Sequence, residues 1–286
     1  MPETFLVIGG NGRVGREVIT QLLDAGHGVR ALVRSEPKVD ALRRSGVEIL
    51  RGDMDNAEAL RSAVEGIRAL YVATSDPEES VEQMRGFVGI ARDAGVEKIV
   101  RLSAMSADPD AASDLSRRHG LRERALEESG LAWTHLRPTW FMQMMLEYAP
   151  GGRLDLPGGE GRIGWIDTRD IAAVAVAAMT GEGHEGKAYE LTGPAALSYQ
   201  ELADTMSAAT GREFIYRDVP RDEYRAMMRA EGEEDWYIDL VLQLYDRISS
   251  DELALVTDGV EQALGRKATG FDVFCRDHAD ALIRQL

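Results

Sequence analysis

The chain has 286 residues, of which 44% are hydrophobic, and its formal net charge is −16. This size and apolar content fit one large globular domain or a domain with an added lobe. The negative charge argues against nucleic-acid binding, since no local basic patch is evident. The longest strongly apolar stretch, residues 171–179, is far shorter than the roughly 20 residues of a membrane helix, and the chain starts with no signal-peptide pattern, so we expect a cytoplasmic protein outside the membrane.

The first predicted element is a buried parallel strand over residues 5–8, which ends at a glycine-rich turn. The turn fits two overlapping dinucleotide-binding fingerprints, one starting at Gly9 and the other at Gly10. Either glycine would permit the tight turn. Gly12 would let a pyrophosphate approach the backbone, and Gly15 would let the next helix pack closely on the strand. That helix points its N-terminus at the anion, so the sequence predicts a nucleotide site here.

The second predicted strand, residues 29–33, ends at Arg34, and a short helix is expected near residues 40–44. NAD-binding folds usually place an acidic residue about 20 residues past the fingerprint. A basic residue there can hold a 2′-phosphate through charge-assisted hydrogen bonds, which favours NADP, with NAD as the lesser alternative. Arg13 could assist. The other interpretation of Arg34 is a solvated surface arginine.

The third predicted strand, residues 47–50, leads into a polar loop. Asp53 is placed to accept a hydrogen bond from the adenine amino group, and Met54 to pack on the adenine ring. Asp55 or Asn56 could instead simply cap the helix that follows.

Two further strands are predicted over residues 68–73 and 99–102, with a helix from Pro77 to Ala94 between them. Ligands of open α/β sheets bind at the carboxyl ends of the strands, where Thr74 and Ser103 lie. The regular alternation of strands and helices predicts a doubly wound parallel sheet, the Rossmann α/β fold.

The chain resembles the NmrA-like family of atypical short-chain dehydrogenases/reductases, and within it the NADPH-dependent quinone reductases. The resemblance runs nearly end to end and rests on local motifs: the turn at 9–15, Val33-Arg34, Gly52-Asp53, Ser103, His119 with Glu123, and the segments 129–138, 165–172, 183–187 and 189–194. It implies a Rossmann core with a small C-terminal lobe rich in α-helix. It also implies cofactor contacts at Gly9, Asn11, Gly12, Arg13, Val14, Arg34, Asp53, Met54, Ala73 and Ser103. Thr74 and Pro138 complete the expected cofactor site.

The catalytic motif of ordinary short-chain dehydrogenases, a serine with Tyr-x-x-x-Lys, is incomplete. No tyrosine or lysine lies between Ser103 and Tyr148, and the corresponding place carries His119. His119 is a candidate proton donor, because an unperturbed histidine pKa lies near neutrality, or else a polar filler at a helix start. Ser103 is expected to orient the nicotinamide or the substrate, since no motif supports an activating base for a nucleophile.

Aromatic and methionine side chains follow the sixth predicted strand, residues 131–136. Trp140, Phe141 and Met144 are candidate substrate contacts that would form a wall for a flat aromatic ring. The alternative is an amphipathic helix that packs its apolar face into the core.

No metal site is expected. His184 and Glu185 are neighbours in a glycine turn and lack the helical spacing of metal ligands. The single cysteine, Cys275, lies near phenylalanines and indicates a buried structural thiol.

We expect a Rossmann domain over residues 1–150 and a C-terminal part over 151–286, which returns to the core at about 165–193 before it forms a substrate lobe. The glycines and prolines of 150–164 indicate a loop. In the lobe, Ser198 with Glu201 forms a capping-box pattern for a helix over 199–210. Helices interrupted by the acidic stretch 231–235 would form a lid.

The sequence therefore predicts an NADPH-dependent reductase that delivers hydride to a quinone or a similar flat electron-poor ring, including a role in tailoring an aromatic natural product. The alternative is a non-catalytic NADP-binding redox sensor that acts through a protein partner. The missing Tyr-x-x-x-Lys motif fits both.

Overall fold

The computed structural model describes residues 3–34, 46–74 and 80–285. The chain forms two compact units. The sheet unit comprises Met1–Pro138, Thr168–Leu191 and Gly259–Arg266, and the lobe comprises Thr139–Asp167, Thr192–Asp258 and Lys267–Leu286. The chain thus leaves the sheet unit at Pro138 rather than near residue 150, and it returns there twice.

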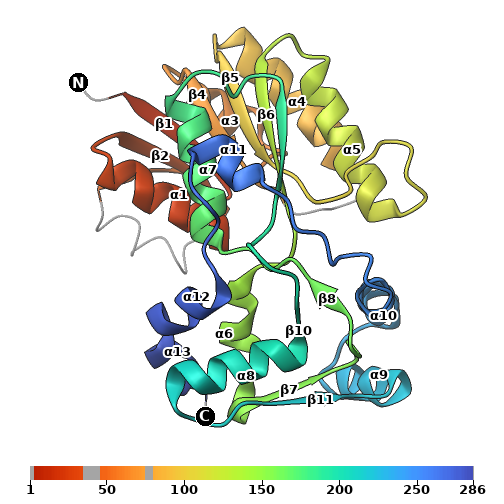
Figure 1. Ribbon diagram of the computed structural model, residues 1–286. Coiled ribbons are helices and arrows are strands. Elements are labelled where there is room, and N and C mark those ends of the chain that lie inside the picture. The colour runs from red at the N-terminus through yellow and green to blue at the C-terminus, as the bar shows by residue number, and fades with distance from the viewer. Residues whose placement is uncertain (1–2, 35–45, 75–79, 286) are drawn as a thin grey trace. The chain divides into compact units, whose positions relative to one another are not determined.

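Seven parallel strands form one sheet in the sheet unit, in the order β3-β2-β1-β4-β5-β6-β9 (Figure 1). The strands are β1 (Thr4–Ile8), β2 (Gly28–Val33), β3 (Glu48–Arg51), β4 (Ala69–Val72), β5 (Lys98–Leu102), β6 (Ala132–Pro138) and β9 (Lys187–Leu191). The strand order reverses between β1 and β4, and in doubly wound folds ligands bind beside the carboxyl ends of strands at such a reversal. The predicted Rossmann fold is confirmed.

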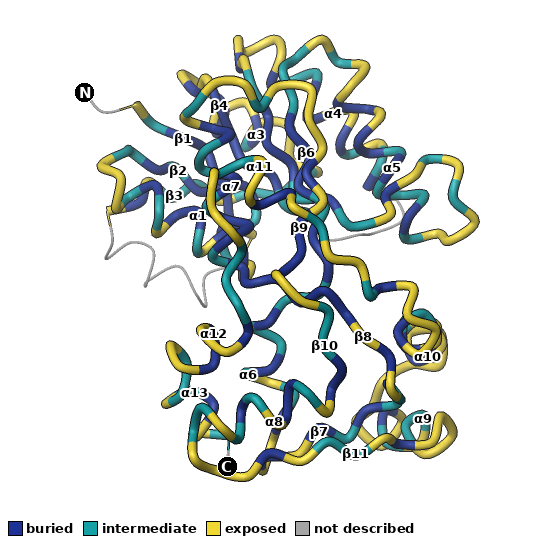
Figure 2. Tube along the Cα trace, viewed as in Figure 1, coloured by how far each residue is buried: buried dark blue, intermediate teal, exposed yellow. Residues whose placement is uncertain are grey.

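Helices cover both faces of this sheet (Figure 1). On one face α1 (Arg13–Asp24) packs against α7 (Thr168–Thr180), and α11 (Gly259–Leu264) packs on α7. The other face carries α3 (Ala57–Val64), α4 (Ser80–Asp93) and α5 (Asp114–Glu127). Apolar side chains at helical spacing explain the packing: Val14, Val18 and Leu22 of α1 are all buried. Figure 2 shows the central strands as a continuous buried layer.

Two predicted elements of this unit fall partly or wholly outside the described residues. The short helix near 40–44 lies there completely, and so does Pro77, the expected start of the next helix. From Ser80 onward that helix is present as α4.

The lobe contains more structure than its sequence predicted. Residues 150–164, expected to be a loop, include the strands β7 (Arg153–Leu156) and β8 (Arg162–Ile163). β7 pairs in parallel with β11 (Ile215–Asp218), and β8 pairs antiparallel with β10 (Leu197–Ser198). The other elements of the lobe are η1 (Met142–Met144), α6 (Met145–Tyr148), η2 (Pro150–Gly152), α8 (Tyr199–Thr210), α9 (Arg221–Ala230), α10 (Asp235–Ser249), α12 (Phe271–Asp277) and α13 (Ala279–Ile283).

Two glycines that suggested the loop have a packing reason instead. A Cβ on Gly158 would lie 2.4 Å from the Tyr199 ring, and one on Gly161 would lie 2.0 Å from the Ile248 carbonyl oxygen. The glycines therefore permit close contact. The capping box at Ser198 is confirmed, because its hydroxyl accepts from the Glu201 N–H at 3.3 Å and the Glu201 carboxylate accepts from the Ser198 N–H at 2.9 Å.

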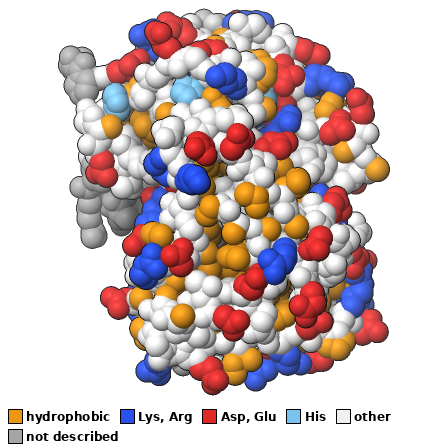
Figure 3. Space-filling view, in the orientation of Figure 1, with side chains coloured by type: hydrophobic (Ala, Val, Ile, Leu, Met, Phe, Trp, Pro, Cys, Tyr) orange, Lys and Arg blue, Asp and Glu red, His pale blue; other side chains and the backbone are white. Residues whose placement is uncertain are grey.

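Cys275 is fully buried, as expected, and burial raises the pKa of its thiol to about 12. On the face drawn in Figure 3, acidic and basic side chains of the described residues are interspersed. No helix within the described ranges combines the length and the hydropathy that spanning a membrane would require.

Candidate functional site

The glycine turn after β1 has the geometry of a phosphate-binding loop. The Gly12 N–H donates to the Gly9 carbonyl at 3.0 Å, and Gly9 has a φ of +86°. A Cβ on Gly9 would lie 2.3 Å from the Ala73 carbonyl oxygen, and one on Gly15 would lie 2.3 Å from the Gly9 carbonyl oxygen. Gly9 rather than Gly10 therefore makes the left-handed turn, and Gly15 lets α1 pack against it.

The start of α1 offers backbone donors to an anion. Gly12 is its N-cap and provides no side-chain cap, and the N–H groups at a helix N-terminus point toward an anion bound there. A Cβ on Gly12 would approach only the Gly9 carbonyl oxygen, at 3.2 Å. Beside it, the Asn11 side-chain oxygen is buried and accepts no hydrogen bond from the residues that the structure describes. These residues fit the pyrophosphate of NAD(P)H.

Arg34 lies directly after β2 and is exposed. The Gly52 N–H donates to the Val33 carbonyl at 3.1 Å, so the loop that carries Asp53 begins beside the end of β2. In this fold, the end of the second strand is where a basic residue can accommodate a 2′-phosphate.

In the same loop, the Asp53 carboxylate accepts a hydrogen bond from the Asp55 N–H at 3.1 Å. The Asn56 side chain accepts from the Ala59 N–H at 3.0 Å and caps α3, which settles the alternative between Asp55 and Asn56 for the cap. Met54 is partly buried against the sheet core.

Ser103 follows β5 and is held by the neighbouring strand. Its N–H donates to the Leu136 carbonyl at 2.7 Å, and the Met105 N–H donates to the Pro138 carbonyl at 3.0 Å. The residue is 4% exposed, and its hydroxyl has no hydrogen-bond partner among the described residues. Because an unsatisfied buried hydroxyl is costly, this atom fits a ligand contact at the carboxyl end of the sheet.

Thr74 lies at the corresponding end of β4, where Arg122 reaches it from α5. Arg122 is fully buried, and its Nη1 donates to the Thr74 hydroxyl at 3.4 Å. The sequence pattern alone does not identify Arg122; its position four residues after Arg118 on the same helix is the signal that could have done so.

His119 lies inside α5 rather than at its start. Burial, together with the charges of Arg101, Arg122 and Arg118, lowers its pKa to about 3. The unperturbed value near neutrality does not apply to this ring, because the imidazolium would be partly desolvated beside three guanidinium groups. At neutral pH the ring is uncharged.

Glu123 lies one turn further along α5, on the side of the helix that faces β5 and β6. It is 2% exposed and accepts two hydrogen bonds from Arg137, at 3.1 Å from Nε and 2.5 Å from Nη2. Nη1 of Arg101 lies 3.9 Å from the same carboxylate. This ion pairing raises the pKa of Arg137. Glu123 is therefore the negatively charged member of a buried network that also contains the guanidinium groups of Arg101 and Arg137.

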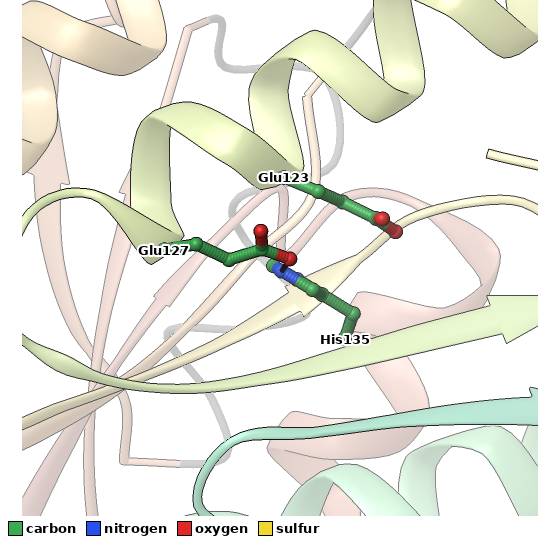
Figure 4. A group of neighbouring side chains, drawn as sticks. All are labelled: Glu123, Glu127 and His135. Atoms are coloured by element: carbon green, nitrogen blue, oxygen red, sulfur yellow. Dashed lines mark ion pairs between the residues drawn. The ribbon is translucent and has the colours of Figure 1, made fainter. Parts of the chain in front are cut away.

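Three potential metal ligands, Glu123, Glu127 and His135, meet beside this network, with their ligand atoms within 4.8 Å of one another (Figure 4). The Glu127 carboxylate lies 3.3 Å from Nε2 of His135, which is fully buried. Burial lowers the pKa of His135 to about 3 and raises that of Glu127. Since the guanidinium of Arg137 occupies the Glu123 oxygens, the group forms an ion-pair network rather than a complete ligand set.

The expected substrate wall belongs to the lobe. Met142 and Met145 are buried in its core, so these two methionines pack in the interior, as the alternative to a substrate wall predicted. Trp140, Phe141 and Met144 are only partly buried. Trp140 contacts the lobe core, with its ring centroid 5.9 Å from that of Trp165.

Comparisons with known proteins agree with this geometry. The model of a family described as NAD(P)H-binding matches residues 9–182. The NAD(P)H azoreductase of Xenophilus azovorans is 38% identical over 281 residues, 97% of this chain and 98% of that protein.

Two solved structures are similar to the whole fold. The Citrobacter sp. triphenylmethane reductase complexed with NADP(H) has a TM-score of 0.82 at 25% identity and covers 96% of this chain and 99% of its own. The Escherichia coli quinone oxidoreductase QOR2 complexed with NADPH has a TM-score of 0.81 at 26% identity. The match covers 98% of this chain and 99% of the quinone oxidoreductase. The chain therefore belongs to the NAD(P)H-binding family and is an NAD(P)H-dependent oxidoreductase, with the fold predicted for an atypical short-chain dehydrogenase/reductase.

Proposed function

We propose that the protein transfers a hydride from NADPH to quinones and related flat, electron-poor aromatic acceptors. The observation that carries the proposal is the α5 face, which offers the uncharged His119 and neither tyrosine nor lysine. Reduction of a simple ketone needs a proton donor for the alkoxide. A quinone accepts hydride readily, and its hydroquinone anion takes a proton from water, so a strong acid is dispensable.

NADPH, when bound, supplies the hydride. In this proposal Arg34 selects the 2′-phosphate, the turn at Gly12 holds the pyrophosphate, and the Ser103 hydroxyl orients the nicotinamide or the acceptor. The remaining proposed cofactor contacts are Gly9, Asn11, Arg13, Val14, Asp53, Met54, Ala73, Thr74 and Pro138.

Trp140, Phe141 and Met144 are the proposed acceptor contacts in the lobe. The names of the similar proteins support a flat conjugated acceptor, because azo dyes, triphenylmethane dyes and quinones share this shape. Tailoring of an aromatic natural product is a narrower form of the same proposal.

An azo compound is the second candidate acceptor, favoured by the 38% identity to an azoreductase over nearly the full length. One hydride and one proton convert the azo bond to a hydrazo compound. Cleavage to two amines consumes a second NADPH.

The test is NADPH oxidation by the purified protein with a benzoquinone, a naphthoquinone, an azo dye and cyclohexanone. We expect turnover with the quinones and none with the ketone. If no acceptor accelerates NADPH oxidation, while NADP⁺ and NADPH bind with clearly different affinities, the redox-sensor alternative replaces the enzyme.

A further inference from the structure

Arg101 and His119 meet in the layer between α5 and the strands β5 and β6. Arg101 on β5 is 2% exposed, and its Nη2 lies 3.4 Å from Nδ1 of His119. Its Nη1 faces the Glu123 carboxylate at 3.9 Å. His119 and Glu123 are four residues apart on α5, so they share the helix face that covers β5. Arg101 thus lies between the carboxylate and the imidazole.

The chemistry of this contact fixes the proton on the imidazole. A guanidinium has five N–H donors, no acceptor, and keeps its charge at every accessible pH. Nδ1 of His119 must therefore accept the hydrogen bond, which leaves the ring proton on Nε2. The opposite tautomer would direct two N–H groups at each other.

Cations surround this imidazole from both packed elements. Arg118 and Arg122 belong to α5, and Arg101 belongs to β5. The Glu123 carboxylate, 3.9 Å from Nη1 of Arg101, is held by Arg137 of β6. Protonation of His119 would add a further positive charge beside three guanidinium groups, and its pKa is accordingly low, about 3.

We propose that Arg101 is a positioning residue that holds His119 as the uncharged Nε2–H tautomer, so that His119 donates a hydrogen bond to the acceptor atom that gains negative charge, without giving up its proton. This inference rests on the proposed function. The hydride and its electron pair go to the acceptor, the product anion takes its proton from water, and His119 is unchanged at the end of the turnover. A fixed neutral donor can stabilise developing negative charge in this way.

The direct test is nitrogen-15 NMR of the imidazole rings in the full-length protein, which has five histidines. Loss of signals in His119→Asn assigns the ring. We expect Nδ1 to resonate as an unprotonated nitrogen and Nε2 as a protonated one, without titration between pH 8 and 5. A protonated Nδ1, or a titration in this range, would overturn the proposal. In Arg101→Met the tautomers should mix, whereas Arg92→Met, on the exposed side of α4, should match wild type.

The kinetic test uses a variant that donates a hydrogen bond but cannot act as an acid. The amide nitrogen of a glutamine can reproduce Nε2–H. With a quinone, we expect His119→Gln to keep kcat within about tenfold of wild type and His119→Ala to lose about 10- to 100-fold, the range for one hydrogen bond to a charged group. KM for NADPH should change little in both.

The outcomes separate the two proposals. Equal losses in His119→Gln and His119→Ala, together with quinone turnover by wild type, would refute the neutral donor and leave the reductase in place. Absence of turnover with every acceptor would refute the proposed function and with it the acceptor contact of His119, whatever tautomer the NMR spectra show.

Discussion

The glycine turn after β1 and the charged layer under α5 belong to the same sheet unit but are built in opposite ways. At the turn, backbone geometry makes the site: Gly9 has a φ of +86°, and Gly15 lets α1 approach within a distance that a Cβ would block. Under α5, buried side chains make the site, because Arg101 and Glu123 are each 2% exposed. The comparison shows that the geometry of the turn is set within one contiguous segment, whereas the charged layer is assembled by residues that the register of the strands and the packing of α5 bring together.

The largest expected effect is at the turn. Gly12→Val should lower NADPH affinity by about 100-fold or more, because its side chain would occupy the space at the N-terminus of α1, and several charge-assisted hydrogen bonds to the pyrophosphate would be lost. The fold should survive, since Gly12 has an ordinary φ of −74°. Calorimetry on the folded variant measures the loss.

A matched control is Gly86→Val on α4, where a Cβ would meet nothing within 4 Å. It should bind NADPH as wild type does. If folded Gly12→Val keeps the wild-type affinity, the turn is not the nucleotide site.

Arg34 tests whether a side chain adds specificity to this backbone site. Arg34→Ala should lower NADPH affinity about 10- to 150-fold and leave NADH affinity nearly unchanged, because only NADPH carries the 2′-phosphate. Titration with both cofactors measures the difference, and Arg92→Ala is the control for loss of an exposed arginine. Equal losses for the two cofactors would contradict the assignment.

The two regions also differ in how well the sequence predicts them. The doubly wound parallel sheet, the glycine turn after the first strand and the capping box at Ser198 are predicted from local patterns, and the structure confirms them. A glycine or a cap acts within a few residues, so its effect can be read from neighbouring positions.

The charged layer could not be predicted in the same way. Arg101 and His135 are partners in the register of β5 and β6, yet they are 34 positions apart in the chain. In its own segment each looks like a solvated residue, but in the fold both are buried. For the same reason the lowered pKa of His119 could not be predicted from its own segment, because the cations that lower it include Arg101 from another element.

His135 allows the energetic cost of this layer to be measured. Its pKa is lowered from 6.5 to about 3, so between these pH values the unfolded chain binds a proton that the native chain does not. Stability is therefore lost as pH falls, by about 1.4 kcal/mol per unit in this window. On going from pH 7 to pH 5, wild type should lose about 2 kcal/mol more free energy of unfolding than His135→Leu.

Urea unfolding of both proteins at the two pH values measures this difference. His119 remains in both, so its own contribution cancels. Equal losses in wild type and His135→Leu would mean that the ring nitrogens are protonated or solvated in the native state.

The smallest expected effect concerns metal ions at Glu123, Glu127 and His135. Zn²⁺ should not raise the melting temperature, and EDTA should not change NADPH oxidation, because Arg101 and Arg137 already pair with the Glu123 carboxylate and a divalent ion would add uncompensated charge to a buried layer. A ligand that binds the native state must raise its stability. A zinc-dependent rise in melting temperature that disappears in His135→Leu would therefore assign a metal site here. Arg137→Met offers the sharper comparison, because it removes the two hydrogen bonds to the Glu123 carboxylate. His135 is buried beside that carboxylate. If Zn²⁺ raises the melting temperature at all, it should do so at a lower concentration in Arg137→Met than in wild type.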